Sequence, residues 1–299
     1  MKQIAVLKII AWSIVVVVLI GVLAAVSMGE DLTNRIPSLK VNLSNVFNNA
    51  KGDVEVLSVQ TLSVENIESI DIKWVSGTFK ILPTDGEQIV ITQKANRELD
   101  KEEMLKIIEE GNRLEISQGR IRGGIFFFGF GGVKIVNELK LPSKHYGKIN
   151  ANFKSGRLLL EDIKTTRFKT NMTSGRVQSS GLIAEHLILE TISGSLDLAG
   201  EFSQIDAKVV SGSVKVDTYA VPDRIDIDLI SGKAVVKIPD NDGFRLSKDK
   251  LAGRVNSEFK TDDFGVYKDG SAEYRVKVVS GKVEILKNPY PITKIDILK

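Results

Sequence analysis

The sequence LILETISGSLDL at residues 187–198 recurs as IDAKVVSGSVKV at 205–216 and as IDIDLISGKAVV at 225–236. In each copy, apolar side chains alternate with other residues on both sides of a Ser-Gly pair. Counted from the Ser, they stand at positions −6, −4 and −2, and then at +3 and +5. Alternation of period two predicts strands that bury one face. The odd step from −2 to +3 requires a bend or bulge at Ser-Gly, where Gly permits an unusual φ and Ser can hydrogen-bond nearby backbone.

The Ser-Gly pair recurs along most of the chain, and each copy is predicted to form a structural turn. The seven pairs are Ser76-Gly77, Ser155-Gly156, Ser174-Gly175, Ser193-Gly194, Ser211-Gly212, Ser231-Gly232 and Ser280-Gly281. Between Ser155 and Ser231 the successive gaps are 19, 19, 18 and 20 residues. Such a repeat, built from strands, is typical of a β-solenoid, whose stacked coils bury the apolar face that one repeat cannot bury alone. We therefore expect an all-β, single-stranded β-helix.

A β-sandwich built from the same strands is the alternative fold. The two folds differ in which strands pair. A solenoid pairs each strand with one about nineteen residues away, as the spacing of the Ser-Gly pairs requires. A sandwich would pair strands that lie much further apart in the sequence.

Composition limits the chemistry available to the chain. It has no cysteine and only two histidines, His145 and His186, and its formal net charge is +3 over 299 residues. Thiol chemistry is therefore excluded, and a histidine triad or metal site has little material. A net charge so near zero argues against a nucleic-acid surface. We expect no cofactor, no metal and no nucleic-acid partner, and we interpret both histidines as ordinary surface or edge residues.

Residues 1–28 have the pattern of a membrane segment. The run from Ile9 to Val26 contains no charged residue, Lys2 and Lys8 precede it, and acidic residues follow it. Eighteen apolar residues are about the length that crosses a bilayer, and the positive end is expected on the cytoplasmic side. We predict a single-pass transmembrane signal-anchor with the C-terminal domain outside the cytoplasm. A signal peptide cleaved near Ser27 is the alternative, although the apolar run is long for one.

The rest of the chain divides into a linker and one large domain. Residues 29–52 are polar and are predicted to be a linker, and 53–299 are predicted to form the β-solenoid domain. Residues 89–148 interrupt the repeat as an insertion. Residues 241–270 interrupt it again, and we expect an irregular coil or a side loop there. The last coil is expected to leave an open edge, which Lys287 and two nearby prolines protect from pairing with another chain.

A short helix is predicted inside the first insertion, at Asp100–Glu110. Asp100 and Glu103 have the spacing of a capping box, and apolar residues recur on one helical face. Gly111 follows at a suitable place to close a helix.

The same insertion contains an unusual Gly/Phe-rich loop. The run IFFFGF at residues 125–130 holds Phe126, Phe127, Phe128 and Phe130. These rings could cap the end of the solenoid core, which would otherwise be open to water. They could equally contact a membrane or a protein partner.

Several features together resemble one bacterial family. They are the N-terminal anchor, the serial Ser-Gly pairs, the Gly/Phe-rich run, and the phrase VNELKLP at 136–142 that leads into Ile149–Gly156. Over about Ile70 to Leu286 the chain resembles the domain of unknown function 4097 family, β-strand-repeat envelope proteins also called candidate adhesins. The resemblance implies a single-stranded β-helix and no catalytic residues. It also implies a link to envelope-stress systems, near which some Gram-positive members are encoded.

Outward-facing acids are the main candidates for an enzyme. Asp226 and Asp228 share the outer face of one predicted strand, and Asp206, Asp197 and Asp217 lie on neighbouring repeats. Stacked carboxylates can bind Ca²⁺, and two carboxyls about 5–9 Å apart in a groove can act as a glycosidase pair. Lysines at 208, 215, 233 and 237 are interleaved with them, which favours an ordinary solvated surface. A nucleophilic Ser is disfavoured, because no Ser-Gly pair has a histidine beside it in the sequence.

We therefore predict a non-enzymatic, membrane-anchored binding or scaffold module outside the cytoplasm, at the cell envelope. An accessory role in envelope-stress signalling is what the resemblance implies. The expected partners are the cell membrane, through the N-terminal helix, and another membrane or envelope protein or a wall polymer. A structural or adhesive cell-surface protein is the second hypothesis, and a carbohydrate-active β-helix enzyme is the third.

Overall fold

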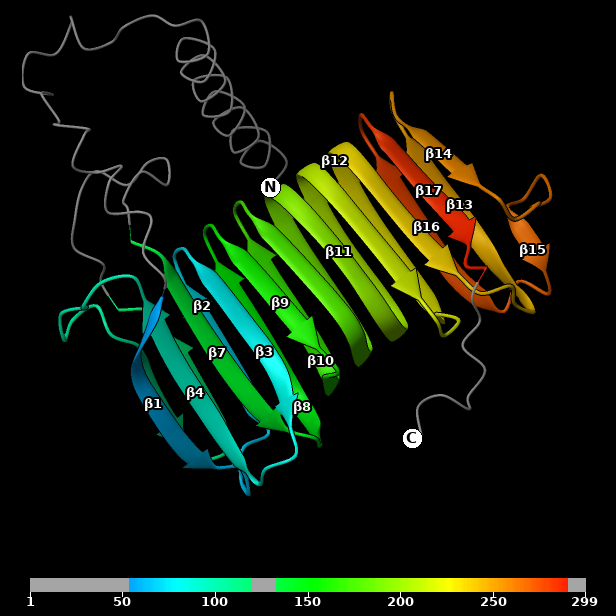
Figure 1. Cartoon of the computed structure of the whole chain (residues 1–299). Coiled ribbons are helices and arrows are strands. Elements are labelled where there is room, and N and C mark those ends of the chain that lie inside the picture. The colour runs from blue at the N-terminus through cyan, green and yellow to red at the C-terminus, as the bar shows by residue number, and fades with distance from the viewer. Residues whose placement is uncertain (1–53, 120–132, 290–299) are drawn as a thin grey trace, which may run out of the picture. The chain divides into compact units, whose positions relative to one another are not determined.

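The computed structural model describes residues 54–119 and 133–289. The regular secondary structure in these residues consists of β-strands, and all of them belong to one sheet. The strands are β1 (Glu55–Ser63), β2 (Ser69–Trp74), β3 (Thr78–Thr84), β4 (Gln88–Ala95), β5 (Lys106–Glu110), β6 (Arg113–Ser117), β7 (Ile135–Pro142), β8 (His145–Phe153), β9 (Arg157–Glu161), β10 (Lys164–Met172), β11 (Arg176–Thr218), β12 (Arg224–Ile238), β13 (Gly243–Lys250), β14 (Arg254–Ser257), β15 (Val266–Lys268), β16 (Ala272–Val278) and β17 (Lys282–Lys287). Figure 1 shows the sheet curled into stacked coils.

Each coil consists of one strand before a Ser-Gly pair and one after it. The strands before the pair stack in parallel with one another, as in β2–β8–β10–β11, and those after it stack in a second parallel layer, as in β3–β9–β11. Phe168 pairs with Leu187 on one side and Ile149 on the other, in both cases nineteen residues away. This pairing confirms the predicted solenoid and excludes the sandwich.

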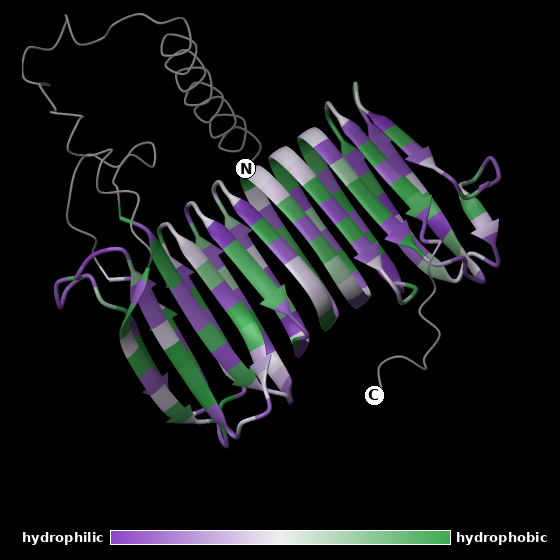
Figure 2. Ribbon diagram, viewed as in Figure 1, coloured by the Kyte–Doolittle hydropathy of each residue, from purple (hydrophilic) through white to green (hydrophobic). Residues whose placement is uncertain are grey.

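The core follows the alternation of the sequence. In β12 the side chains at positions −6, −4, −2, +3 and +5 are all at most 1% exposed, and the residues between them face outward. The chain bends at Ser231-Gly232, so the odd step between −2 and +3 leaves both halves facing the interior. Figure 2 shows the resulting alternation of hydrophobic and hydrophilic bands along the strands. Burying one apolar face of every coil against its neighbours is what stabilises the stack.

The first insertion builds one end of the solenoid. β6 pairs in parallel with β2, and β7 pairs in parallel with β3, so β6 and β7 together form a coil outside the first Ser-Gly coil. β4 pairs antiparallel with β7, and β1 pairs antiparallel with β4. Residues that interrupt the repeat in the sequence therefore extend and close the same core.

The prediction of a helix at Asp100–Glu110 is wrong. Residues 101–104 form a turn, in which the Glu103 N–H donates to the Asp100 carbonyl oxygen at 2.8 Å and the Asp100 N–H donates to Glu103 Oε2 at 3.1 Å. The capping spacing is thus real but serves a single turn. β5 follows and pairs antiparallel with β6, and Gly111, at φ +60°, lies in the connection. An isolated helix of this length is only marginally stable. The hydrogen bonds that β5 forms with β6 therefore stabilise a strand over the helix.

The prediction that the last coil leaves an open edge is also wrong. β16 and β17 lie between β12 on one side and β13 and β14 on the other. Figure 1 shows red β17 enclosed in this way. The second interruption, residues 241–270, is therefore the outermost coil, and its strands β14 and β15 have only 4 and 3 residues. Short outer strands limit pairing with another chain.

Candidate functional site

All seven Ser-Gly pairs lie along one edge of the solenoid, and their glycines stack on one another. Their φ angles range from +105° to +152°, a region that favours glycine. A Cβ atom on Gly175 would lie 2.3 Å from the Gly156 carbonyl oxygen, and one on Gly232 would lie 2.1 Å from that of Gly212. Glycine is therefore required at this edge for two reasons: the positive φ angle disfavours other residues, and the backbone of the next coil leaves no space for a Cβ atom.

Backbone hydrogen bonds between coils close this edge. The Ser174 N–H donates to the Lys154 carbonyl oxygen at 2.7 Å, and the Arg176 N–H donates to that of Gly156 at 2.8 Å. The Ser side chains are exposed, and in the part of the chain that the structure describes none of their Oγ atoms makes a hydrogen bond to the protein. The backbone bond that we expected from the Ser hydroxyl is therefore absent there, and glycine makes the turn.

An eighth corner completes the edge at the outermost coil. Lys250 pairs with Val278 and Arg254 pairs with Lys282, which places Ala252-Gly253 beside Ser280-Gly281. The Ala252 N–H donates to the Val279 carbonyl oxygen at 2.8 Å, as a Ser does in the other corners. The Ser-Gly pattern misses this corner, because Ala252 replaces Ser and lysines, Lys248 and Lys250, occupy the usual apolar positions −4 and −2.

The residue before each Ser forms a row along the edge. Ile192, Val210, Ile230, Val279 and Leu251 occupy this position in five successive coils and are 41%, 38%, 52%, 39% and 84% exposed. We call these five residues the aliphatic row. Val75 has the same place nearer the other end and is half exposed. Aligning the repeats would have revealed the row, since an outward position in a strand is expected to be polar.

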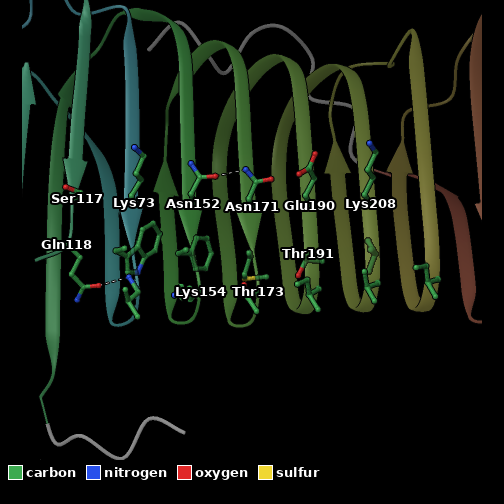
Figure 3. Close-up of a pocket in the computed structure, with 18 of the residues that line it drawn as sticks. Lys73, Ser117, Gln118, Asn152, Lys154, Asn171, Thr173, Glu190, Thr191 and Lys208 are labelled. Carbon is green, nitrogen blue, oxygen red and sulfur yellow. Dashed lines mark hydrogen bonds between the residues drawn. The ribbon is translucent and has the colours of Figure 1, made fainter. Parts of the chain in front are cut away.

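A groove of about 820 Å³ runs beside the row. Its other wall consists of outward side chains at position −3, namely Lys73, Asn152, Asn171, Glu190, Lys208 and Asp228. Figure 3 shows the first five of these side chains, Lys73 to Lys208, in line. Asn171 Nδ2 donates to Asn152 Oδ1 at 2.5 Å. Gln118 closes the groove at one end, where its Oε1 accepts hydrogen bonds from the N–H groups of Val75 and Ser76. Beside Ile192, Val210 and Ile230 the groove is thus aliphatic on one wall and polar on the other, whereas Lys154 and Thr173 occupy the same wall nearer Gln118.

The acids that suggested an enzyme are paired with cations. Asp226 Oδ2 lies 2.5 Å from Arg275 and 3.5 Å from Arg224. Asp206 accepts a hydrogen bond from Arg224 at 3.0 Å and lies 2.6 Å from His186 Nε2. Both guanidinium groups sit among the carboxylates, so this arrangement is an ionic network on the outer sheet surface.

Asp197 and Asp217 are likewise paired with a cation, and Asp228 has lysines beside it on both neighbouring strands. Lys215 Nζ lies 3.2 Å from Asp197 and 2.8 Å from Asp217. Asp228 is in register between Lys208 and Lys277. Among the described residues, no group of three or more His, Asp or Glu side chains is placed to hold a metal ion.

The two histidines lie apart, each with its own partner. His145 Nε2 lies 2.8 Å from Thr166 Oγ1, and His186 is the histidine beside Asp206. Neither is close to a Ser-Gly serine in the sequence, and neither lines the groove.

Two predicted features fall outside the described residues. Phe126, Phe127, Phe128 and Phe130 belong to the segment 120–132. Residues 1–28 are the other feature. The described residues contain no helix long and apolar enough to cross a membrane.

Comparison with protein families identifies the fold. The family model described as Toastrack DUF4097 matches residues 67–204 and again 149–286, which together cover well over half of the chain. The double match agrees with a repeated coil. No curated protein matches the chain.

Several solved structures are similar at low identity. A candidate cell adhesion protein from Clostridium sporogenes is 16% identical, with 80% of this chain and 100% of that chain covered and a TM-score of 0.39. A candidate adhesin from Parabacteroides merdae is 17% identical, with 79% and 97% covered and a TM-score of 0.38. A candidate lipid binding protein from Parabacteroides distasonis is 15% identical, with 80% and 98% covered and a TM-score of 0.35. The family assignment depends on the family model.

Proposed function

The chain belongs to the Toastrack DUF4097 family, and we propose that it is a non-enzymatic binding module held outside the cytoplasm by its N-terminal segment. Its binding surface in this proposal is the Ser-Gly edge, with the aliphatic row and the groove beside it. An accessory role in envelope-stress signalling is the finer form of the proposal. A structural or adhesive role is the alternative, and the two differ in whether the partner is a membrane protein or a surface polymer.

The observation that carries the proposal is the aliphatic row. Other outward positions of the coils are mainly polar, whereas this one is aliphatic in five successive coils. Coils stack about 4.8 Å apart, so the row is about 19 Å long. Contiguous exposed apolar patches commonly mark interaction sites. The groove overlaps the row at Ile192, Val210 and Ile230 and continues past it toward Val75, which adds a concave surface for an extended partner.

The stacked coils make this surface rigid. Backbone hydrogen bonds join each corner to the next, and the glycines leave no space between neighbouring coils. A rigid surface loses little conformational entropy on binding, which favours affinity. The paired acids give no such support to the carbohydrate-active hypothesis, and we do not propose it.

A crosslinking experiment in native membranes tests the proposal. A photoreactive side chain would be placed at Val210, in the aliphatic row, and in a separate variant at Val235, on the outer face of the second layer. We expect discrete crosslinked products from position 210 that position 235 does not form. Replacing Ile192 and Ile230 by Ser should remove these products, and the stability should change little because both side chains are substantially exposed.

The chain contains no cysteine, so its location can be tested independently. Val235→Cys in the full chain should react with a membrane-impermeant maleimide in intact cells. Equal crosslinking at 210 and 235 would refute the edge as the binding surface. Protection of the cysteine until the cells are lysed would refute the extracytoplasmic location.

A further inference from the structure

The Ser-Gly edge contains no acidic residue. Each of the eight corners that the structure describes has four positions, from the residue before Ser (or Ala252) to the second residue after it, and none of these positions is Asp or Glu. Two of the four positions are fixed as Ser (or Ala) and Gly, and over the other two an even distribution of the chain's 38 acids in 299 residues would place about two acids in the eight corners. The same positions hold six cations, namely Lys154, Arg157, Arg176, Lys233, Lys282 and Arg254.

The opposite edge of the solenoid has a different composition. The strand connections there carry acids at Asp85, Glu87, Asp162, Glu201, Asp223 and Asp240, together with the cation Lys144. The two outer sheet surfaces carry both signs, as the salt bridges of Asp226 and Lys215 show. The absence of acids is therefore particular to the Ser-Gly edge.

Four of the six edge cations make no ion pair with an acid that the structure describes, namely Lys154 and the three arginines. Arg157, Arg176 and Arg254 are exposed and make no ion pair with any residue that the structure describes. Lys233 and Lys282 share Glu284, at 2.9 and 2.6 Å. Arg254 shares its corner with Leu251, whereas Arg176 and Arg157 lie in the first and second corners beyond that of Ile192, so the free guanidinium groups flank the aliphatic row on the same edge.

We propose that the Ser-Gly edge docks on an anionic lipid bilayer, with the aliphatic row inserted among the headgroups and the cations bound to lipid phosphates. This inference rests on the proposed function, whose binding surface it assigns to one partner. Interfacial membrane binding combines buried apolar side chains with attraction to anionic lipids, and both components lie on this edge. A soluble polyanion would account for the cations but would leave the aliphatic row without a role.

The N-terminal part of the chain is consistent with this geometry. The predicted linker, 29–52, could span up to about 80 Å when extended. That length lets the edge reach the bilayer that the N-terminal segment is proposed to cross. Docking would then be an intramolecular event with a high effective concentration of membrane.

The test uses the full chain reconstituted in vesicles. Because the chain has no cysteine, an environment-sensitive dye can be attached at a single introduced cysteine, Leu251→Cys in the aliphatic row or Val221→Cys at the opposite edge. Vesicles of phosphatidylcholine alone are compared with vesicles that contain 30% phosphatidylglycerol. We expect a blue shift, and quenching by lipid-borne bromine, at position 251 in the anionic vesicles only. Position 221 should remain in water in both.

Charge variants test the electrostatic part. Replacing Arg157, Arg176 and Arg254 by Gln should lower the ratio of docked to undocked edge by about a hundredfold, since each surface cation contributes about 1 kcal/mol to binding an anionic leaflet. Replacing Arg167, Arg245 and Lys140 by Gln makes the same change in net charge away from the edge. This control should leave docking unchanged.

Each possible outcome decides the inference. A dye at 251 that stays in water in both vesicles would overturn it, and the proposed function would survive if the edge still crosslinks to a partner in native membranes. Equal docking in neutral vesicles, or equal loss with both charge variants, would also overturn it. Protection of the edge by a soluble glycerol-phosphate polymer, without insertion into vesicles, would assign the edge to a wall polymer instead. Loss of both docking and crosslinking would refute the proposed function as well.

Discussion

A single methyl group on the glycine ladder should destabilise the whole solenoid. The change is Gly175→Ala, which adds a Cβ atom 2.3 Å from the Gly156 carbonyl oxygen and 2.9 Å from the Gly156 nitrogen. Real Cβ atoms do not approach backbone atoms so closely. Since both atoms belong to the backbone of the neighbouring coil, no side-chain rotation relieves the overlap, and the two coils must separate.

The expected magnitude has two components. Gly175 has φ +125°, where an alanine is strained by about 1–3 kcal/mol. Overpacking that forces backbone shifts costs about 1–3 kcal/mol more. We expect the free energy of unfolding to fall by about 3–5 kcal/mol, a large part of the 5–15 kcal/mol typical of a domain. In a solenoid this loss falls on the interface between two neighbouring coils, so unfolding could also become less cooperative.

The assay is urea unfolding of the full chain in detergent, followed by far-UV circular dichroism. Two matched controls separate the ladder from a general effect of substitution. Gly147→Ala has its nearest contact at 3.5 Å and an ordinary φ, and Ser174→Ala removes an exposed hydroxyl that makes no protein hydrogen bond in the described part of the chain. Both should change the free energy of unfolding by no more than about 0.5 kcal/mol. A midpoint for Gly175→Ala equal to that of the unmodified chain would refute the reasoning.

Three further predictions concern polar groups in the core. Asn137 is fully buried, and neither polar atom of its side chain has a hydrogen-bond partner. Because a buried polar group without a partner costs free energy, Asn137→Leu should raise the free energy of unfolding by about 1–2 kcal/mol in the same urea assay. A decrease would contradict this prediction. Burial raises the pKa of Asp71, but the hydrogen bond from Asn150 and the pairing with Arg113 lower it by more, so the net shift is downward. Its contribution is present above the unfolded pKa of about 3.8 and is lost as the pH falls through the folded value. Asp71→Asn should therefore cost about 1–2 kcal/mol at pH 7, and the cost should disappear in acid; a cost independent of pH would exclude this role. Tyr274 Oη donates a hydrogen bond to the Pro222 carbonyl oxygen at 3.0 Å, and burial raises the pKa of Tyr274, so the hydroxyl keeps its proton at pH 7. Tyr274→Phe should therefore lower the free energy of unfolding by about 1–2 kcal/mol. An unchanged free energy of unfolding would show that the bond contributes nothing.

The repeat made the fold and one edge of the candidate site predictable. Period two identifies the buried face because it depends only on neighbouring residues. Ser-Gly marks the corner because φ is a local property that glycine satisfies best. The aliphatic row was also visible in principle, since Ile192, Val210, Ile230 and Val279 all precede Ser.

Other parts of the site could not be predicted, because they depend on residues that are distant in the sequence. Gln118 closes the groove by accepting bonds from Val75 and Ser76, more than forty residues earlier. Leu251 joins the aliphatic row only because β13 pairs with β16. The stretch at Asp100–Glu110 has a real capping turn, and only its pairing partner β6 decides that a strand follows.

The sequence by itself determined that the chain forms coils, where each coil bends and which side chains enter the core. These features are set within one repeat by alternation and by the conformational freedom of glycine. The tertiary structure decided the order in which the coils stack. The coil at 243–257 lies outside the one at 272–287, and the coil built from β6 and β7 lies outside the one built from β2 and β3. Parallel coils offer the same hydrogen-bonding groups to any neighbour, so adjacency is settled by packing across the whole stack, and chain order does not specify it.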